Sequence, residues 1–297
     1  MSGTALPVAE QLADRYGVRT GEIRPHRPVA REDLPDRVHP DGASRLQAAI
    51  EYITAEHVSG RPVLVGTASV AQSEHLADEL AQAGIASVVL NAKNDADEAT
   101  IIARAGEYGR VTISTQMAGR GTDIRLGGAS GNDSERIIAL GGLCVVGIGR
   151  YDSRRLDDQL RGRAGRQGDP GTSVLFTSLE DDLMCRHLPG FAQSLRKAYG
   201  APFNPDTAVE LVDHAQRLAE GIQQRSHQNT LAFAEVPTNQ RAAVLRLRAE
   251  IFTGGPFADL LNDGHALLSM RWGPKLTPHR SRLRSEPSAC TNLTSVG

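Results

Sequence analysis

Residues 61–91 have the sequence RPVLVGTASVAQSEHLADELAQAGIASVVLN, which contains one complete strand–helix–strand unit. The apolar run RPVLVG (61–66) predicts a short buried strand, and ASVVLN (86–91) predicts a second one. Between them, Ser69 and Gln72 have the spacing of a capping box, which marks the start of a helix, and Gly84 marks its end. A strand followed by a helix and another strand favours parallel pairing of the two strands.

The same alternation continues on both sides of this unit. SRLQAAIEYITAEHV (44–58) and DADEATIIARAG (95–106) have apolar residues at helical spacing, and RVTIST (110–115), LCVVGI (143–148) and TSVLFTS (172–178) predict further strands. Strands and helices alternating at this spacing predict a doubly wound parallel α/β domain over about residues 41–180. The loops that bind ligands in such a sheet are expected beyond the carboxyl ends of its strands.

The two ends of the chain have a different character. Residues 1–40 carry little apolar periodicity and are predicted to be a connector. After residue 205 an apolar stripe at helical spacing predicts a helix that Pro237 interrupts, followed by a second helix in TNQRAAVLRLRAEIF (238–252). From about residue 254 the chain is rich in Gly, Pro, Ser and Arg, which predicts a poorly ordered tail.

Composition excludes several classes of protein. The 297 residues are 40% hydrophobic and 23% charged, which is typical of a soluble globular protein. The net charge of −2 and an aromatic content of 4% argue against a nucleic-acid binder, which would be more basic and better supplied with stacking rings. Three widely spaced cysteines predict neither a disulfide framework nor a metal site and favour a reducing compartment. No apolar run has the length of a membrane span, and no signal peptide is expected.

The segment RGRAGRQGDPG (161–171) places three arginines at 161, 163 and 166 among glycines. Guanidinium groups so close together repel one another, so an anion is expected in front of them. If the preceding helix extends to these glycines, Arg163 and Arg166 lie on one face and can converge on one polyphosphate. Gln159 would lie one turn earlier and could position a water. The alternative is a solvated face whose arginines pair with nearby acidic residues, namely Asp152, Asp157, Asp158 and Asp169.

A second glycine-rich loop, STQMAGRGTDIRLGG (114–128), follows the predicted strand 110–115. Arg120 lies between Gly119 and Gly121 and could reach a phosphate, and Asp123 could accept hydrogen bonds from ribose hydroxyls. The alternative is a glycine-shaped turn in which Asp123 caps the next element.

These strings resemble known motors. QLRGRAGR (159–166) resembles the last signature motif of superfamily-two helicase-like motors. Together with TQMAGRGTDIRLGG (115–128), RPVLVGTASVAQSEHLADEL (61–80), GGLCVVGIGRYDSRR (141–155) and SLEDDLM (178–184), it resembles the second nucleotide-binding domain of SecA, the preprotein translocase ATPase. The resemblance covers roughly residues 1–253. The high arginine content, with lysine only at positions 93, 197 and 275, favours the accessory SecA paralogue of actinobacteria.

The resemblance implies a fold and a site. It predicts a RecA-like second motor domain with a helical scaffold, divided into a connector (1–40), the RecA-like domain (41–190), a scaffold segment (191–253) and a tail (254–297). In this family two RecA-like lobes sandwich ATP, and the first lobe supplies the phosphate loop, the magnesium ligands and the catalytic base. The second lobe would supply Arg163 and Arg166 as arginine fingers, with Gln159 opening their motif. The nucleotide would also contact residues that match the family's motifs, namely Asp123, Arg120, Gly119, Gly121, Thr122, Gly162 and Gly165.

The implied partners are those of a secretion motor. They are the first motor domain or a full-length SecA, the SecYEG channel, unfolded preproteins and an anionic membrane surface, without nucleic acid. The implied location is the cytoplasm, at the inner face of the cytoplasmic membrane.

Some features of a complete motor are missing from the sequence. The chain contains no Gly-Lys pair and therefore no G-x-x-x-x-G-K-[ST] phosphate loop. DEAT (97–100) imitates a magnesium-binding tetrad, but it follows a polar segment and is predicted to open a helix. The initial MSGTA resembles the end of the first motor domain, so that domain, the preprotein-crosslinking insertion and the zinc tail are expected to be absent. We expect weak nucleotide affinity and negligible hydrolysis by this chain alone. The alternatives are a carboxyl-terminal helicase domain and a degenerate SecA fragment that does not hydrolyse ATP.

Overall fold

The computed structural model describes residues 5–90, 95–115, 122–128, 130–190 and 205–253. The chain divides into two compact units, residues 1–228 and residues 229–297. The sheet and its helices belong to the first unit, whereas the second contains the last turns of one long helix. The predicted tail, residues 254–297, lies outside the described residues.

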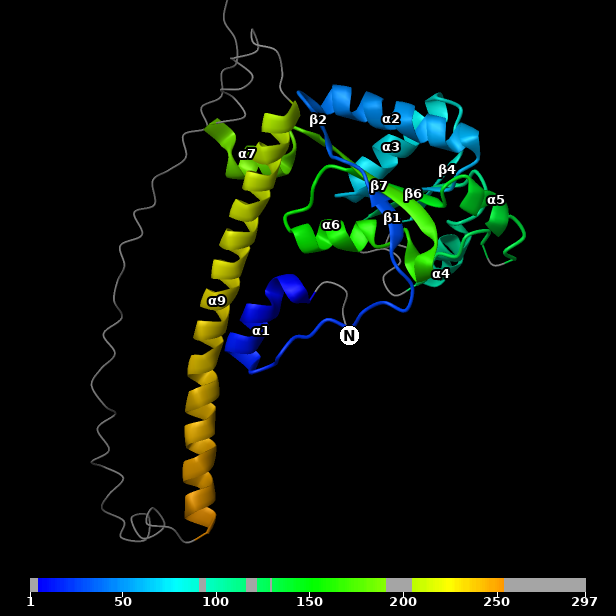
Figure 1. The fold of residues 1–297 in the computed structure, drawn as a ribbon. Helices are drawn as coiled ribbons and strands as arrows, with labels where there is room; N and C mark the ends of the chain where they lie inside the picture. Colours follow the sequence, from blue (N-terminus) through cyan, green and yellow to red (C-terminus); the bar gives the residue numbers. More distant parts are fainter. Residues whose placement is uncertain (1–4, 91–94, 116–121, 129, 191–204, 254–297) are drawn as a thin grey trace, which may run out of the picture. The chain divides into compact units, whose positions relative to one another are not determined.

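One parallel sheet forms the centre of the first unit (Figure 1). Its order is β1-β7-β6-β3-β5-β4, and β2 also pairs with β7. The strands are β1 (Ala30–Asp33), β2 (Arg37–His39), β3 (Val63–Thr67), β4 (Ser87–Leu90), β5 (Val111–Thr115), β6 (Leu143–Ile148) and β7 (Pro170–Ser178). Every strand pair in the sheet is parallel. The predicted parallel α/β fold is confirmed.

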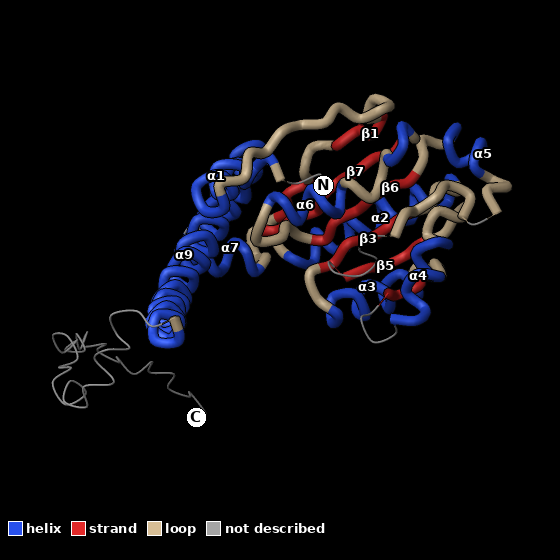
Figure 2. The backbone as a smooth tube through the Cα atoms, turned by 90° about the horizontal axis from the view of Figure 1, so that it is seen from below, coloured by secondary structure: helices blue, strands red, loops and turns tan. Residues whose placement is uncertain are grey.

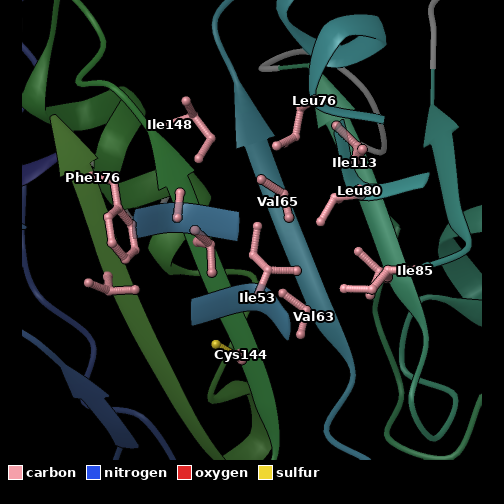
Figure 3. Packing of buried hydrophobic residues seen from close by; sticks show 14 residues of the cluster. Ile53, Val63, Val65, Leu76, Leu80, Ile85, Ile113, Cys144, Ile148 and Phe176 are labelled. Carbon is pink, nitrogen blue, oxygen red and sulfur yellow. The ribbon is translucent and has the colours of Figure 1, made fainter. Parts of the chain in front are cut away.

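Helices cover both faces of the sheet (Figure 2). On one face lie α2 (Gly42–Ser59) and α3 (Val70–Gln82), and on the other lie α4 (Asp95–Arg104), α5 (Ser134–Ala139) and α6 (Arg154–Arg161). Consecutive side chains of β3 point to opposite faces of the sheet. Val63 and Val65 pack in the hydrophobic cluster under α2 and α3, and Leu64 packs in the cluster on the opposite face. Figure 3 shows Ile53 of α2 and Leu76 and Leu80 of α3 among the strand side chains of the first cluster.

The predicted capping box at the beginning of α3 is present in a shifted form, because the Gln72 side chain reaches the residue before the N-cap Ser69. The Ser69 hydroxyl accepts a hydrogen bond from the Gln72 backbone N–H at 3.2 Å, and the Gln72 side-chain oxygen accepts one from the Ala68 N–H at 2.8 Å. Gly84 follows the helix with a φ of +79°, as a terminating glycine does. DEAT (97–100) lies within α4, so it opens a helix, as predicted, and does not end a buried strand.

The amino-terminal segment contains more structure than its sequence pattern predicts. A 3-10 turn, η1 (Leu6–Val8), leads into α1 (Ala9–Tyr16), and β1 and β2 extend the sheet beyond β7. Both strands are short, and only Val38 of their seven residues is buried. They pair with the two halves of the nine-residue β7, β1 with Pro170–Ser173 and β2 with Phe176–Ser178.

The chain continues through α7 (Asp182–His187) to the long helix α9 (Pro205–Phe252). The predicted break at Pro237 is wrong, because α9 runs through this residue. A proline removes one helical hydrogen bond, here to the carbonyl of Phe233, and at this exposed position water can satisfy that carbonyl. The first turns of α9 pack through Val212 and Ala215 against Leu183 of α7. No helix in the described ranges is long and apolar enough to cross a membrane.

Candidate functional site

Helix α6 leads into the arginine-rich segment and lies on the face of the sheet that is also covered by α4 and α5. The helix lies close to β3, since a Cβ on Gly66 would come within 2.5 Å of the Leu160 side chain. It starts after the carboxyl end of β6 and runs back toward the start of β7. The segment that follows, residues 162–168, is called the arginine loop below. A Cβ on Gly171, the second residue of β7, would approach Ala164 Cβ within 2.9 Å. The arginine loop therefore lies at the amino end of β7, and its expected position beyond the carboxyl ends is wrong.

The predicted helical face of Arg163 and Arg166 is also wrong. Helix α6 ends at Arg161, and Gly162 is its C-cap. Gly165 then adopts a left-handed conformation with a φ of +68°, and Arg166 opens the 3-10 turn η2 (Arg166–Gly168). The helix ends before either arginine, and the left-handed backbone at Gly165 prevents it from continuing through Arg166. The two side chains are positioned by a loop.

The arginine loop contacts the second glycine-rich loop. Arg166 Nη1 donates to Asp123 Oδ1 at 3.0 Å and to the Thr122 carbonyl at 3.1 Å, and its Nε donates to the Gly162 carbonyl at 3.1 Å. The Gln167 amide donates to the other oxygen of Asp123 at 3.1 Å. The Arg166 and Asp123 side chains are 32% and 37% exposed. Four predicted site residues, Arg166, Asp123, Thr122 and Gly162, are therefore brought together at the surface.

The remaining predicted site residues differ in position. Gly165 lies in the arginine loop beside Arg166. Arg163 is partly buried, and its backbone N–H donates to the Leu160 carbonyl at 3.0 Å. Gln159 is partly buried on the last turn of α6, and among the described residues it has no hydrogen bond to Arg166 or Asp123. Gly119, Arg120 and Gly121 lie outside the described residues.

The amino-terminal segment crosses the arginine loop, which sequence reasoning missed. A Cβ on Gly165 would come within 2.5 Å of Arg31 Cβ, so only glycine fits beneath this segment. Arg31 Nη1 donates to the Ala164 carbonyl at 3.5 Å, and Arg27 Nη1 donates to the Gln167 carbonyl at 3.3 Å. A cavity of about 460 Å³ lies between the two segments. These contacts join residues more than 130 positions apart in sequence, so no local pattern could have predicted them.

Gln167 has strained backbone geometry. Among the described residues, Gln167 is the one residue other than glycine whose φ is positive, at 56°. Such a conformation is unfavourable for a residue with a Cβ and persists only when its surroundings impose it. Here Asp123 holds the side chain and Arg27 holds the carbonyl. The loop conformation at Arg166 is thus imposed by contacts from two distant segments.

Two of the crowded arginines, Arg161 and Arg166, pair with carboxylates other than Asp152, Asp157, Asp158 and Asp169. Arg161 pairs with Asp36 at 3.0 Å, and Arg166 pairs with Asp123 at 3.0 Å. Asp157 instead pairs with Arg150 at 3.0 Å.

The residues present fit a phosphate. An Asp123 carboxylate oxygen lies where Arg166 would hold an oxygen of an anionic ligand, so the guanidinium already has the geometry of an anion contact. Within the described part of the chain, no group of three His, Cys, Asp or Glu residues could hold a metal.

Comparison with known proteins agrees with the sequence motifs. The model of the SecA P-loop domain family matches residues 28–135 and 130–199. The "Protein translocase subunit SecA 2" of Thermobifida fusca (strain YX) is 50% identical over 252 residues, which cover 84% of this chain and 33% of that protein. The SecA 2 of Mycobacterium sp. (strain KMS) is 50% identical over 248 residues, covering 84% of this chain and 32% of that protein.

Solved structures with a matching segment are more distant. Domain 2 of the DEAD-box helicase Mss116p, bound to an RNA duplex, has a TM-score of 0.40 and 18% identity over 55% of this chain and 60% of that chain. The E. coli DEAD-box protein SrmB, bound to RraA, has a TM-score of 0.41 and 19% identity over 54% of this chain and 84% of that chain.

The family match extends over more than half of the chain and includes both glycine-rich loops. This chain spans about a third of the length of the curated relatives it matches. The matching family model describes a P-loop domain, a class of nucleotide-binding domain. With its parallel RecA-like sheet, its motifs and its 50% identical translocase relatives, the chain belongs to the SecA family.

Proposed function

We propose that this chain supplies the arginine side of a composite ATP site in a SecA-type translocase motor. The observation that carries the proposal is the surface contact between Arg166 and Asp123, which joins two glycine-rich loops. Both side chains are partly exposed and have the chemistry that a nucleoside triphosphate requires, a guanidinium for phosphate and a carboxylate for ribose hydroxyls.

Nucleotide binding would exchange the partners of this ion pair. An exposed ion pair contributes about 0–1 kcal/mol to stability, so separating Arg166 from Asp123 costs little. A bidentate bond from a guanidinium to a phosphate is charge-assisted and stronger. Arg166 would therefore turn to the γ-phosphate together with Arg163, and Asp123 would become available to the ribose. In the transition state the two guanidinium groups would neutralise charge on the transferred phosphoryl group. Gln159 and Gly119–Gly121 are proposed to complete this side of the site.

The other side of the site is proposed to come from a first motor domain. The sequence has no Gly-Lys pair, so the phosphate loop must be supplied by another lobe. That lobe would also hold magnesium, which neutralises charge on the β- and γ-phosphates when bound. Because the phosphate loop makes most contacts to the triphosphate, this chain alone would bind ATP weakly and would not hydrolyse it.

The cycle of closing on ATP and opening after hydrolysis would move the helical segment that follows the sheet. In a translocase this movement would push unfolded preproteins through the SecYEG channel, at the anionic inner surface of the cytoplasmic membrane, with no role for nucleic acid. The similarity to subunits named as protein translocases supports this proposal.

The test is ATP turnover by two proteins, the 297-residue chain and a chimera. In the chimera, residues 28–253 replace the corresponding segment of the Thermobifida fusca SecA 2 relative. We expect negligible turnover by the chain and turnover within about tenfold of the intact relative by the chimera, since the site residues match the family motifs. An inactive chimera that is folded and contains an intact phosphate loop would refute the proposal. Turnover by the chain alone at the rate of the intact relative would also refute it. Salt-sensitive binding of single-stranded RNA by the chain would favour the helicase alternative.

A further inference from the structure

Arg150 lies in the turn between β6 and α6, and its guanidinium group is surrounded by acidic residues. The side chain is only 10% exposed. Its Nε contacts Asp36 Oδ2 at 2.6 Å, its Nη1 contacts Asp157 Oδ2 at 3.0 Å, and its Nη2 contacts Asp213 Oδ1 at 3.0 Å. With Gln216, whose side-chain oxygen accepts from Nη1 at 3.2 Å, these residues are called the Arg150 junction below.

The junction joins three separate elements of the first unit. Asp36 precedes β2, Asp157 lies on α6, and Asp213 and Gln216 lie on the first turns of α9. Asp36 also pairs at 3.0 Å with Arg161, the last residue of α6 and the neighbour of the arginine loop. Both ends of α6 are therefore held by contacts that converge on one buried cluster.

Gln216 connects α9 to α6 most directly. Its amide donates to Asp157 Oδ2 at 2.7 Å and to the Tyr151 carbonyl at 2.9 Å, and it is 4% exposed. The second oxygen of Asp157 accepts from the Tyr151 backbone N–H at 3.0 Å, and Asp157 is 1% exposed. If α9 moved away from α6, a buried carboxylate and a buried carbonyl would each lose a donor. Buried polar groups without partners are strongly unfavourable, so the two helices should move together.

A second contact, at the start of α6, also holds α6 against α9. The Arg154 backbone N–H, at the first position of α6, donates to Glu220 Oε1 of α9 at 2.7 Å. The contacts of α6 with α9 therefore include two positions on each helix, 154 and 157 on α6 and 216 and 220 on α9.

We propose that Arg150 is a positioning residue that makes α6 and the first turns of α9 one rigid element. The arginine loop then follows α9, and a displacement of α9 changes the position of Arg163 and Arg166. This inference rests on the proposed function for its catalytic consequence, but the rigid element itself does not depend on ATP.

The test uses Gln216→Leu, which removes the amide that reaches Asp157 and Tyr151. The control is Gln223→Leu, the same substitution at an exposed position on the same helix. The first measurement is amide hydrogen exchange in the 297-residue chain. We expect exchange in residues 154–168 to rise about tenfold in Gln216→Leu and to remain unchanged in Gln223→Leu, with α2 and α3 unchanged in both variants. Unchanged exchange in residues 154–168 would overturn the proposal, and so would an equal rise in α2 and α3.

The second measurement is ATP turnover in the chimera, which separates a positioning role from a purely structural one. We expect Gln216→Leu to lower kcat about tenfold while KM for ATP stays within about twofold, because misplaced arginines weaken the transition state more than the bound substrate. Arg150→Lys, which cannot satisfy three carboxylates in a planar arrangement, should lower kcat in the same way. An active chimera whose kcat is unaffected by either change would overturn the coupling. An inactive unsubstituted chimera would count against the proposed function, and hydrogen exchange would then decide on the rigid element alone.

Discussion

Replacing Arg150 with methionine should lower the free energy of unfolding, and the size of the loss should depend on pH. Methionine keeps the apolar stem and removes the charge that three carboxylates share. Breaking a buried ion pair by removing one partner costs about 3–5 kcal/mol. The lower end applies here, because Asp213 is 43% exposed and can be hydrated, and Asp36 keeps Arg161. Asp157 is the carboxylate left without a cation. We expect Arg150→Met to lower the free energy of unfolding by about 3 kcal/mol at neutral pH.

The pH dependence follows from the protonation of Asp157. Burial raises the pKa of this carboxyl above its ordinary value, and hydrogen bonds from Gln216 and the Tyr151 N–H together with Arg150 oppose the rise. Without Arg150 the folded-state pKa rises further above that of the unfolded chain. A carboxyl with a raised folded pKa destabilises the fold as pH rises through that pKa, so the penalty is present at neutral pH and decreases as pH falls.

The assay is urea unfolding of the 297-residue chain, followed by circular dichroism at about pH 7 and about pH 5. The double variant Arg150→Met, Asp157→Asn serves as the control, because the neutral amide removes the unpaired charge, keeps an oxygen that can accept from the Tyr151 N–H and should recover most of the loss. A loss of unfolding free energy below about 1 kcal/mol at pH 7 would refute the reasoning, because removing an exposed ion pair costs no more than that. A loss that increases toward pH 5 would refute it as well.

Two further substitutions test local features of the fold. Asp41→Ala removes the N-cap of α2, whose Oδ1 accepts from the Ser44 N–H at 2.7 Å, and should cost about 1 kcal/mol in thermal unfolding. This backbone hydrogen bond lowers the pKa of Asp41, so the cap's contribution should be lost as pH falls through that lowered pKa, and an equal cost at all pH values would contradict the assignment. Gly165→Ala should cost more than Gly17→Ala, because both positions have a positive φ but only Gly165 would place a Cβ against Arg31. Equal losses of unfolding free energy would show that the Arg31 contact imposes no constraint.

Much of the fold could be predicted from the sequence because its elements have strong local patterns. The five strands between residues 61 and 178 are apolar runs, and α3 has its start and end marked by Ser69 and Gly84. β1 and β2 could not be predicted, because they are short and mostly polar and pair with a long strand far along the chain. The continuity of α9 through Pro237 could not be predicted either, since a proline pattern alone does not show whether the freed carbonyl is solvated.

The candidate site was predicted in its residue types but not in its geometry. The glycines and arginines indicated an anion site, and the structure brings Arg166 to Asp123. The helix was expected to extend up to the glycines with Arg163 and Arg166 on one face, whereas it ends at Arg161 and Gly165 adopts a left-handed conformation. The Arg150 junction was missed because its contacts join residues 36, 150 and 216, and no local pattern predicts such pairing.

The most direct measurement is ATP turnover by the chimera carrying both Arg163→Lys and Arg166→Lys. Lysine keeps the positive charge but lacks the planar fork, so we predict that kcat falls by about 10³-fold or more. Arg104→Lys, an exposed arginine on α4 that pairs with Glu107, should leave kcat unchanged. Full turnover in the double variant would contradict the assignment of these arginines to the triphosphate.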